Sequence, residues 1–340
     1  MIANSTPVPL YSPAWAAYPP PADLPPVLIN DQRLPLVSIV TPSYNQGRYI
    51  GATIESVLGQ DYPNIEHWVI DGGSSDDTIE VIQRYTADPR LHWVSARDQG
   101  QSDAINKGWS RCRGAILAWL NSDDTYLPGA ISTQVQALAA NPACGLVYGD
   151  SIYIDAEGRE LSRIYSRPYS PLALLRLELP HQPTVFLRRA LIEALGPLNL
   201  ARRYSMDTDY WVRAARITSF QRTAQFIATY RLHGESKSVA QFEGFYRDWL
   251  AIANQFFADP ALPAALRAER NAVIADLLAA MANLEARQGS LAAALRCMSL
   301  ALARSGPRPR MLKLPLALLS RLAGRDLGAY TTQLWSYLKR

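Results

Sequence analysis

The sequence predicts an α/β domain with a largely parallel sheet, followed by an α-helical region. Two patterns carry this prediction. From Leu36 to Asp150, short apolar runs bounded by Gly, Pro, Asn or Asp alternate with longer segments of helical spacing, which is typical of parallel strands joined by crossover helices. From about Gln241 onward the spacing is helical throughout. A chain of 340 residues has room for both parts.

The proline content separates a third segment, at the start of the chain. Residues 1–34 contain eight of the 24 prolines and show little periodicity, so we expect an extended or disordered leader. The α/β domain is then predicted over residues 35–240, and the helical region over residues 241–340.

Five apolar runs are the predicted strands of the first part of the α/β domain. They are LVSIVTP (36–42), IEHWVID (65–71), LHWVS (91–95), AILAWLN (115–121) and GLVYGD (145–150). Ligands of such sheets bind beyond the carboxyl ends of the parallel strands. The polar segments that follow these runs are therefore expected along one rim: TPSYNQ, DGGSSDDT, ARDQGQSD and NSDDTY.

The pattern is looser after Asp150, but four segments can still be assigned. They are a hairpin in SIYIDAEGREL that turns at Glu157-Gly158, a strand and a short helix in HQPTVFLRRALIEALG, a helix in DTDYWVRAAR, and a final strand in AQFIATYRLHG.

The helical region contains one recognisable unit. In residues 277–309, Gly289 separates two Ala-rich helices and Pro307 closes the second, which resembles a single tetratricopeptide hairpin. One such unit cannot bury its own apolar face, so we expect it to pack on the main domain or on a partner.

The net charge of +4 is unevenly distributed. Residues 287–340 contain ten Lys or Arg and one Asp, which favours an anionic surface as a partner of this tail. Residues 310–340 mix Leu, Trp and Tyr with Arg and Lys, so they suit either a basic amphipathic helix in a membrane interface or a helix packed on the domain. The residues leave both open.

Several function classes are not favoured. No apolar run is long enough to span a bilayer, and the start of the chain lacks the order of a signal peptide, so a cytoplasmic location is expected. Cys112, Cys144 and Cys297 are scattered, which argues against a disulfide framework or a thiolate metal site. No G-x-G-x-x-G follows the first strand, and the basic residues lack aromatic-interleaved sheet motifs, so neither a dinucleotide-dependent oxidoreductase nor a nucleic-acid-binding protein is expected.

Acidic clusters reach the predicted rim. Asp76 and Asp77 stand at an expected helix start, and a capping role is favoured for them. Asp123 and Asp124 are adjacent, and like charges that close are unfavourable unless a cation, a basic partner or water compensates them. Oxygen ligands of this kind suit a hard divalent cation. The spacing alone does not decide among these explanations.

Longer stretches carry a family resemblance. Residues 37–78 and 105–131, with MDTDYWVRAARI and YRLHGESKS further on, closely resemble the inverting family 2 glycosyltransferases of bacterial polysaccharide biosynthesis. The resemblance covers Leu36 to Ser238. It implies the GT-A fold, a Rossmann-like, mostly parallel sheet with helices on both faces. It also implies transfer of a sugar from a nucleotide-diphosphate donor to an acceptor hydroxyl, with Mn²⁺ or Mg²⁺ neutralising the leaving diphosphate.

The resemblance assigns metal-binding residues. NSDD matches the DXD-type motif of the family, which implies Asp124 as the better metal ligand and Asp123 as nearer to the donor ribose or sugar and a second candidate ligand. Some members close the site with a His on the metal or diphosphate, and His233 matches it. Arg231 and Lys237 are implied near the same phosphates.

Donor-binding residues are implied by three further matches. The turn that contains Thr41, Pro42 and Tyr44 would lie beside the base and ribose. Asp71 matches a base-contacting acid, although Gly72 stands where the family commonly has a second acid. The helix opened by DQGQSDAINKG offers Gln101 and Asp103 as donor contacts. Lys107 fits equally well as a solvated helix charge.

The remaining matches concern the acceptor. Asp207 matches the general base, which would take the proton of the attacking hydroxyl, and Met206 stands where the family often has Glu. Asp209 is expected to be structural, capping the helix or pairing with Arg213 at i+4. The acceptor region of the family is matched more weakly, by His181, Gln182 and Met206.

The resemblance thus implies an enzyme that uses a UDP-, dTDP- or GDP-sugar and a glycan or lipid-linked acceptor, in the synthesis of a cell-surface or exported polysaccharide. With a membrane-bound tail it would be peripheral at the inner face of the plasma membrane. One alternative is a catalytically inactive nucleotide-sugar-binding protein, which predicts a broken base or metal motif. The other is a membrane-docked assembly protein, whose activity would be lost with the tail.

Overall fold

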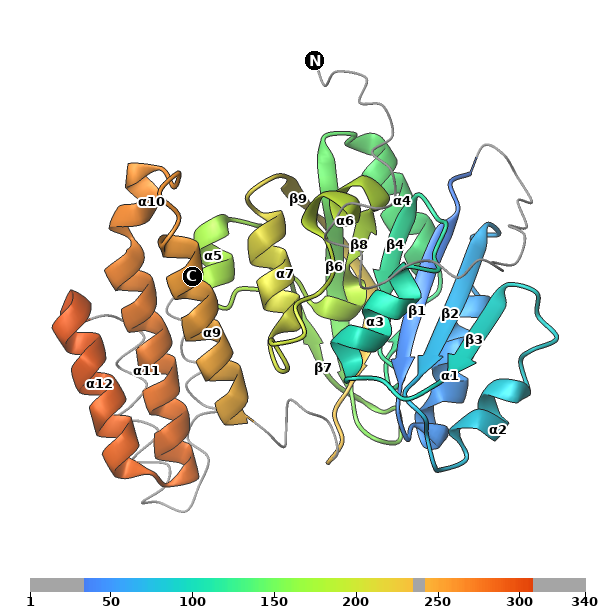
Figure 1. Ribbon diagram of the computed structural model, residues 1–340, viewed down its shortest axis with the longest axis horizontal. Coiled ribbons are helices and arrows are strands. Elements are labelled where there is room, and N and C mark those ends of the chain that lie inside the picture. Colours follow the sequence, from blue (N-terminus) through green and yellow to red (C-terminus); the bar gives the residue numbers. More distant parts are fainter. Residues whose placement is uncertain (1–33, 235–241, 308–340) are drawn as a thin grey trace. The chain divides into compact units, whose positions relative to one another are not determined.

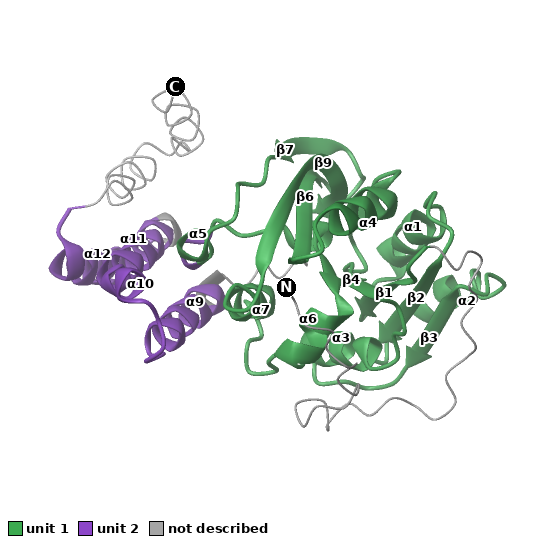
Figure 2. Cartoon of the chain, turned by 90° about the horizontal axis from the view of Figure 1, so that it is seen from above, with its two compact units in different colours: residues 1–174, 178–242 green, residues 175–177, 243–340 purple. Residues whose placement is uncertain are grey.

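The computed structural model describes residues 34–234 and 242–307. The predicted leader up to residue 33, Lys237 and the basic tail from residue 308 lie outside the described residues. The chain divides into two compact units (Figure 2). The first consists of the residues up to 174 together with 178–242, and the second consists of 175–177 together with the residues from 243 on.

The described residues of the first unit form one nine-stranded sheet. Its order is β3-β2-β1-β4-β8-β6-β9-β5, and β7 pairs with β6. The strands are β1 (Val37–Ser43), β2 (Ile65–Asp71), β3 (Leu91–Ser95), β4 (Ile116–Trp119), β5 (Thr125–Tyr126), β6 (Cys144–Ile154), β7 (Glu160–Ile164), β8 (Phe186–Arg188) and β9 (Ser219–Arg231).

The first four strands form the parallel half of the sheet that the alternating pattern predicts. Strand β1 pairs in parallel with β2 and β4, and β2 pairs in parallel with β3. Beyond β4 the sheet is mixed, because β8 runs antiparallel to both β4 and β6, while β6 and β9 are parallel. The predicted hairpin is confirmed by the antiparallel pair β6–β7, and Gly158 supplies its positive φ of 85°.

Helices cover both faces of this sheet, as the predicted fold class requires. Figures 1 and 2 show α1 and α4 on one face and α3 and α6 on the other. The helices are α1 (Gly47–Leu58), α2 (Thr78–Gln83), α3 (Gln101–Trp109), α4 (Ala130–Ala140), α5 (Pro171–Leu175), the short 3₁₀ helix η2 (Gln182–Thr184), α6 (Arg189–Leu195) and α7 (Met206–Ala214).

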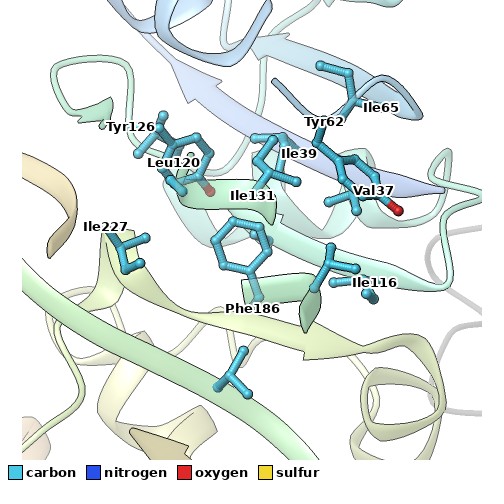
Figure 3. Close-up of a cluster of buried hydrophobic side chains, with 14 of the residues drawn as sticks. Val37, Ile39, Tyr62, Ile65, Ile116, Leu120, Tyr126, Ile131, Phe186 and Ile227 are labelled. Atoms are coloured by element: carbon cyan, nitrogen blue, oxygen red, sulfur yellow. The ribbon is translucent and has the colours of Figure 1, made fainter. Parts of the chain in front are cut away.

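One buried core cluster of the first unit lies between the sheet and helix α4. Ile39 of β1, Ile116 of β4, Ile131 of α4, Phe186 of β8 and Ile227 of β9 belong to one buried cluster (Figure 3). The members come from strands far apart in the sequence, so burial of this apolar surface holds the parallel and the mixed halves together.

Gly108 allows α3 to pack closely on the sheet. A Cβ atom at this position would lie 2.4 Å from Cγ1 of Val40 and 3.2 Å from Cγ1 of Ile70. We expect Gly108→Ala to lower the free energy of unfolding, because overpacking costs about 1–3 kcal/mol and the better helix propensity of Ala returns at most about 1 kcal/mol. Urea unfolding measures the change. Gly234→Ala is the control, since nothing lies within 4 Å of its Cβ; equal stability of the two variants would contradict this packing.

The second unit is helical. Its helices are α9 (Phe242–Phe257), α10 (Ala264–Ala268), α11 (Arg270–Gln288) and α12 (Leu291–Ser305). The predicted break is confirmed, because Gly289 ends α11 with a φ of 97°. Helix α12 ends at Ser305 and Gly306 is its C-cap residue, directly before the predicted Pro307. No helix among the described residues is long and apolar enough to cross a membrane.

Three residues that precede η2 in the sequence also belong to the second unit. Arg176 pairs with Glu269 at 2.8 Å and with the buried Asp276 at 3.2 Å. The chain therefore contributes residues 175–177 to the helical unit and returns to the first unit at Glu178.

Candidate active site

The two adjacent aspartates lie in the connection between β4 and β5, at the carboxyl end of the parallel strands. Asp124 is 1% exposed. The backbone N–H of Arg231 donates to its Oδ1 at 2.9 Å, and Nδ2 of Asn121 donates to its Oδ2 at 3.3 Å. Burial, and after it the charge of Asp123, raises the pKa of Asp124 well above its usual range. The carboxylate of Asp124 is therefore buried beneath the site and accepts hydrogen bonds from the surrounding chain.

Asp123 is the more accessible of the two carboxylates. Its side chain is 21% exposed, and Nε2 of His233 lies 3.0 Å from its Oδ2. The ring of His233 packs against Tyr49 of α1, with 4.8 Å between the centroids. The structure thus brings together two predicted site residues that are 110 positions apart in the sequence.

Arg231 fixes the segment that carries this pair. Its Nε donates to the carbonyl oxygen of Asp123 at 2.9 Å, and its Nη1 donates to the carbonyl oxygen of Asp155 at 3.0 Å. The guanidinium lies 5.0 Å from the centroid of the Tyr49 ring, a cation–π arrangement. Arg231 is thus a basic partner of the two adjacent aspartates. It is only 7% exposed, and its guanidinium orders the surrounding backbone.

Asn121 connects the predicted donor and acceptor segments. Its Oδ1 accepts a hydrogen bond from Nε2 of Gln101 at 2.7 Å, and its Nδ2 donates to Oε1 of Gln182 at 3.1 Å. Gln182 in turn donates to the carbonyl oxygen of Trp119 at 2.8 Å. The sequence did not single out Asn121 as a connecting residue, because its partners come from distant segments.

Asp207 stands in the first turn of α7 and is partly exposed. Burial raises the pKa of Asp207, and the hydrogen bonds from Thr208 act against this, including the N–H of Thr208 at 2.7 Å. Asp209 has the structural role predicted for it, since its Oδ2 accepts from Nε of Arg213 at 2.9 Å. Asp207 is therefore the carboxylate of this helix that suits proton transfer.

Aromatic packing sets the position of α7. The ring of Trp211 stacks on Trp119 of β4 at 5.2 Å, and Tyr210 packs on Trp109 of α3 at 5.3 Å. The side chain of Met206 also contacts α3, because Oγ of Ser102 in that helix donates to its Sδ at 2.9 Å. The predicted acceptor contact of Met206 thus falls on a side chain that packs against α3.

The side chains of three residues predicted to contact the donor make hydrogen bonds within the rim of the sheet. Asp71 is fully buried and accepts from the backbone N–H groups of Gly73 and Ser74 at 2.9 Å each. Oγ1 of Thr41 lies 2.9 Å from Nε2 of His67. Oδ2 of Asp103 accepts from the N–H of Gln99 at 3.0 Å.

The other predicted rim residues have different surroundings. Pro42 lies buried in β1, whereas Tyr44, just after the strand, is 61% exposed. Lys107 pairs with Asp103 at 2.8 Å. Of the two acids predicted to cap α2, Asp76 accepts a hydrogen bond at its Oδ1 from the N–H of Thr78 at 3.1 Å. Asp77 is the N-cap residue, but its side chain makes no capping hydrogen bond.

His181 directly precedes η2 and contacts two residues of β6. Its Nδ1 is 2.7 Å from Oγ of Ser151, and its Nε2 is 3.0 Å from the hydroxyl of Tyr153. Burial lowers the pKa of His181 to about 4, so the ring is neutral at physiological pH.

The residues that could hold a cation are few. Among residues 34–234 and 242–307, no group of three or more His, Cys, Asp and Glu side chains is placed to hold a metal ion by itself. The carboxylate of Asp123 and the imidazole of His233 offer one oxygen and one nitrogen donor side by side, a set that accepts a divalent metal whose other ligands come from elsewhere.

Comparisons with known proteins give a consistent result. The family described as Glycosyl transferase family 2 matches residues 38–195. A chondroitin synthase of Escherichia coli is 30% identical over 226 residues, which are 66% of this chain and 33% of the synthase. A hyaluronan synthase of Pasteurella multocida is 26% identical over 225 residues, or 66% of this chain and 23% of that protein. The chain thus spans a third or less of these two relatives.

Two solved structures are similar in fold. The mannosyltransferase PcManGT of Pyrobaculum calidifontis, in complex with GDP-Man and Mn²⁺, has a TM-score of 0.61 and 20% identity, and the match covers 90% of this chain and 85% of that one. Residues 1–349 of S. aureus TarS, in complex with UDP-GlcNAc, have a TM-score of 0.62 and 16% identity, with 85% and 92% covered. At these identities the likeness is one of fold.

Proposed function

We propose that this chain is a family 2 glycosyltransferase, which transfers a sugar from a nucleoside-diphosphate donor to an acceptor hydroxyl with inversion. The match of residues 38–195 to the Glycosyl transferase family 2 model supports the proposal, as does the GT-A fold that a helical extension follows. The observation that carries the proposal is the contact between Asp123 and His233 at the carboxyl end of the sheet. The likeness to chondroitin and hyaluronan synthases supports a polysaccharide or another glycan as the product.

Asp123 and His233 are the residues that would hold a divalent metal ion in this site. A bound cation would neutralise the charge that develops on the leaving diphosphate. Imidazole is a better ligand for Mn²⁺ than for Mg²⁺, which favours oxygen and water, so we favour Mn²⁺. The Mn²⁺ in the PcManGT complex is consistent with this preference.

Asp124 receives a different role in this proposal from the one that the sequence motif implies. Its oxygens accept hydrogen bonds from the backbone of Arg231 and from Asn121, and it is almost fully buried. We therefore assign direct metal contact to Asp123 and a supporting role to Asp124, which orders the segment around the site.

Asp207 is the proposed general base. The acceptor hydroxyl must lose its proton as it attacks the anomeric carbon, and a positioned carboxylate accepts it. The stacking of Trp211 on Trp119 fixes the helix that presents this carboxylate. Inversion needs no covalent intermediate, so one base suffices.

Nucleotide binding provides the direct test of this function. The chain would be titrated calorimetrically with UDP, dTDP and GDP, each with and without Mn²⁺, and release of the nucleotide from the corresponding sugar donors would be followed. We expect one nucleotide to bind tightly and only with Mn²⁺, because a cation held by Asp123 would neutralise the charge of the diphosphate. Weak binding of all three without a metal effect, together with no donor cleavage, would contradict the proposal.

The pH dependence of transfer follows from the burial of Asp207. Because burial raises the pKa of this carboxyl and only the ionised form accepts a proton, activity should be present above the raised pKa and be lost as pH falls through it. The acid limb of kcat/KM should therefore lie above the value of about 4 that is usual for Asp. Rates measured between about pH 4 and 9 check this. A profile that stays flat down to about pH 4 would exclude Asp207 as the base.

A further inference from the structure

Three aromatic side chains outside the proposed metal and base residues gather on β6, the start of η2 and β9. The ring centroids of Tyr153, His181 and Tyr230 are 5.2 to 5.5 Å apart in all three pairs. Tyr153 and Tyr230 are register partners on parallel strands, so their side chains share one face of the sheet. All three residues are partly exposed. We call this group the aromatic wall.

The aromatic wall lies beside the proposed active site. The next pair along the two strands is Ile154 and Arg231, and the N–H of Arg231 binds Asp124. The charge of Asp124 is close enough to add to the effect of burial in raising the pKa of Tyr153.

A second connection runs from the aromatic wall toward the proposed base. Gln182, the neighbour of His181, donates to the carbonyl oxygen of Trp119, and the ring of Trp119 stacks on Trp211 in the helix of Asp207. The aromatic wall is therefore linked both to the metal-binding segment and to the helix that would deprotonate the acceptor.

The chemistry of the aromatic wall suits a part of a ligand that carries no charge. His181 is neutral, and its two ring nitrogens are engaged with Ser151 and Tyr153. A neutral imidazole donates at one nitrogen and accepts at the other, so the bond to His181 uses only part of the capacity of the Tyr153 hydroxyl. The group thus combines apolar ring faces with one oriented hydroxyl, as ligand sites commonly do.

We propose that Tyr153, His181 and Tyr230 form a subsite for a sugar ring of the acceptor, which packs on the ring of Tyr230 and hydrogen-bonds to the hydroxyl of Tyr153. The inference rests on the proposed function and adds the substrate class: a carbohydrate acceptor recognised by its sugar ring. The three side chains carry no positive charge, which favours a sugar ring over the phosphates of a lipid carrier as the group bound here.

Two variants separate the ring from the hydroxyl. Tyr230→Leu removes the aromatic face but keeps apolar volume, and Tyr153→Phe keeps the ring but removes the hydroxyl. The probes are a chondroitin hexasaccharide and chitohexaose, with binding followed by calorimetry and transfer by product analysis. Cleavage of the nucleotide sugar in the absence of an acceptor is measured in parallel. Tyr165→Leu and Tyr165→Phe are matched controls, since Tyr165 is 64% exposed and packs on Phe226.

We expect each wall variant to weaken binding of at least one hexasaccharide by about 3- to 10-fold, as for the loss of one aromatic contact or one hydrogen bond. Donor cleavage and the Tyr165 variants should be unchanged. Unaltered hexasaccharide binding in both variants overturns the inference, as does an equal loss of donor cleavage. A wild-type chain that cleaves its donor but binds neither hexasaccharide overturns the inference alone, whereas absence of metal-dependent nucleotide binding and of donor cleavage overturns the proposed function.

Discussion

Replacement of Asp207 by Asn should lower the rate of glycosyl transfer by about 10²- to 10⁴-fold, which is the usual contribution of a general base. The amide has nearly the same size as the carboxylate but cannot take the proton of the acceptor hydroxyl. The helix itself should stay in place, because Trp211 still stacks on Trp119 and Asp209 still pairs with Arg213. Nucleotide binding should therefore be retained.

The measurement is kcat for transfer, with nucleotide affinity determined on the same sample. Glu193→Gln is a matched control, because Glu193 of α6 is another partly buried carboxyl whose pKa burial raises, and it has no proposed role in catalysis. A fully active Asp207→Asn variant would exclude Asp207 as the base. An equal loss of nucleotide affinity would indicate a role in donor binding instead.

Asp123→Asn should have the second large effect, on metal-dependent nucleotide binding. The loss of a direct ligand is expected to raise the Mn²⁺ concentration required for half-maximal binding by more than about 100-fold. Asp124→Asn should have a smaller effect, in the range of about 10- to 100-fold that is typical of residues supporting a ligand. The difference follows from the contact of Asp123 with His233 and from the burial of Asp124.

Each of these two variants is the control for the other, since they make the same chemical change at adjacent positions. Calorimetric titration of Mn²⁺ at a fixed nucleotide concentration gives both values, and thermal melting shows whether each variant is folded. A larger loss in a folded Asp124→Asn variant would restore the assignment that the sequence motif implies. Equal nucleotide binding with and without Mn²⁺ in the wild-type chain would remove the metal from the proposal.

Local patterns in the sequence predicted the elements of the parallel half and the ion pair of Asp209 with Arg213. Strand spacing and i+4 spacing involve neighbours in the chain, so they can be recognised without a fold. The antiparallel strand β8 and the two-residue strand β5 could not be oriented in this way. Their direction depends on pairing with β4, β6 and β9, which come from distant parts of the sequence.

The same distinction applies to the candidate site. Asp71 binds the N–H groups two and three residues after it, and the Asp-Gly-Gly-Ser stretch was a local signal for this turn. The hydrogen bonds of Asn121 with Gln101 and Gln182 join segments 20 and 61 residues apart. Tyr49 lies against Arg231 and His233 from the opposite end of the domain sequence. Packing alone brings these residues together, so no spacing rule identifies them.

The position of residues 175–177 within the helical unit affects how the protein can be dissected. A chain truncated at residue 242 would lose Glu269 and Asp276, the acids that pair with Arg176. A fragment that starts at residue 243 would keep the buried Asp276 and lose its arginine. Either truncation divides the helical unit, because residues 175–177 belong to it. Loss of function after either truncation would therefore not by itself show that the missing part has a function of its own. A truncation after residue 307 removes the basic tail and leaves these ion pairs intact.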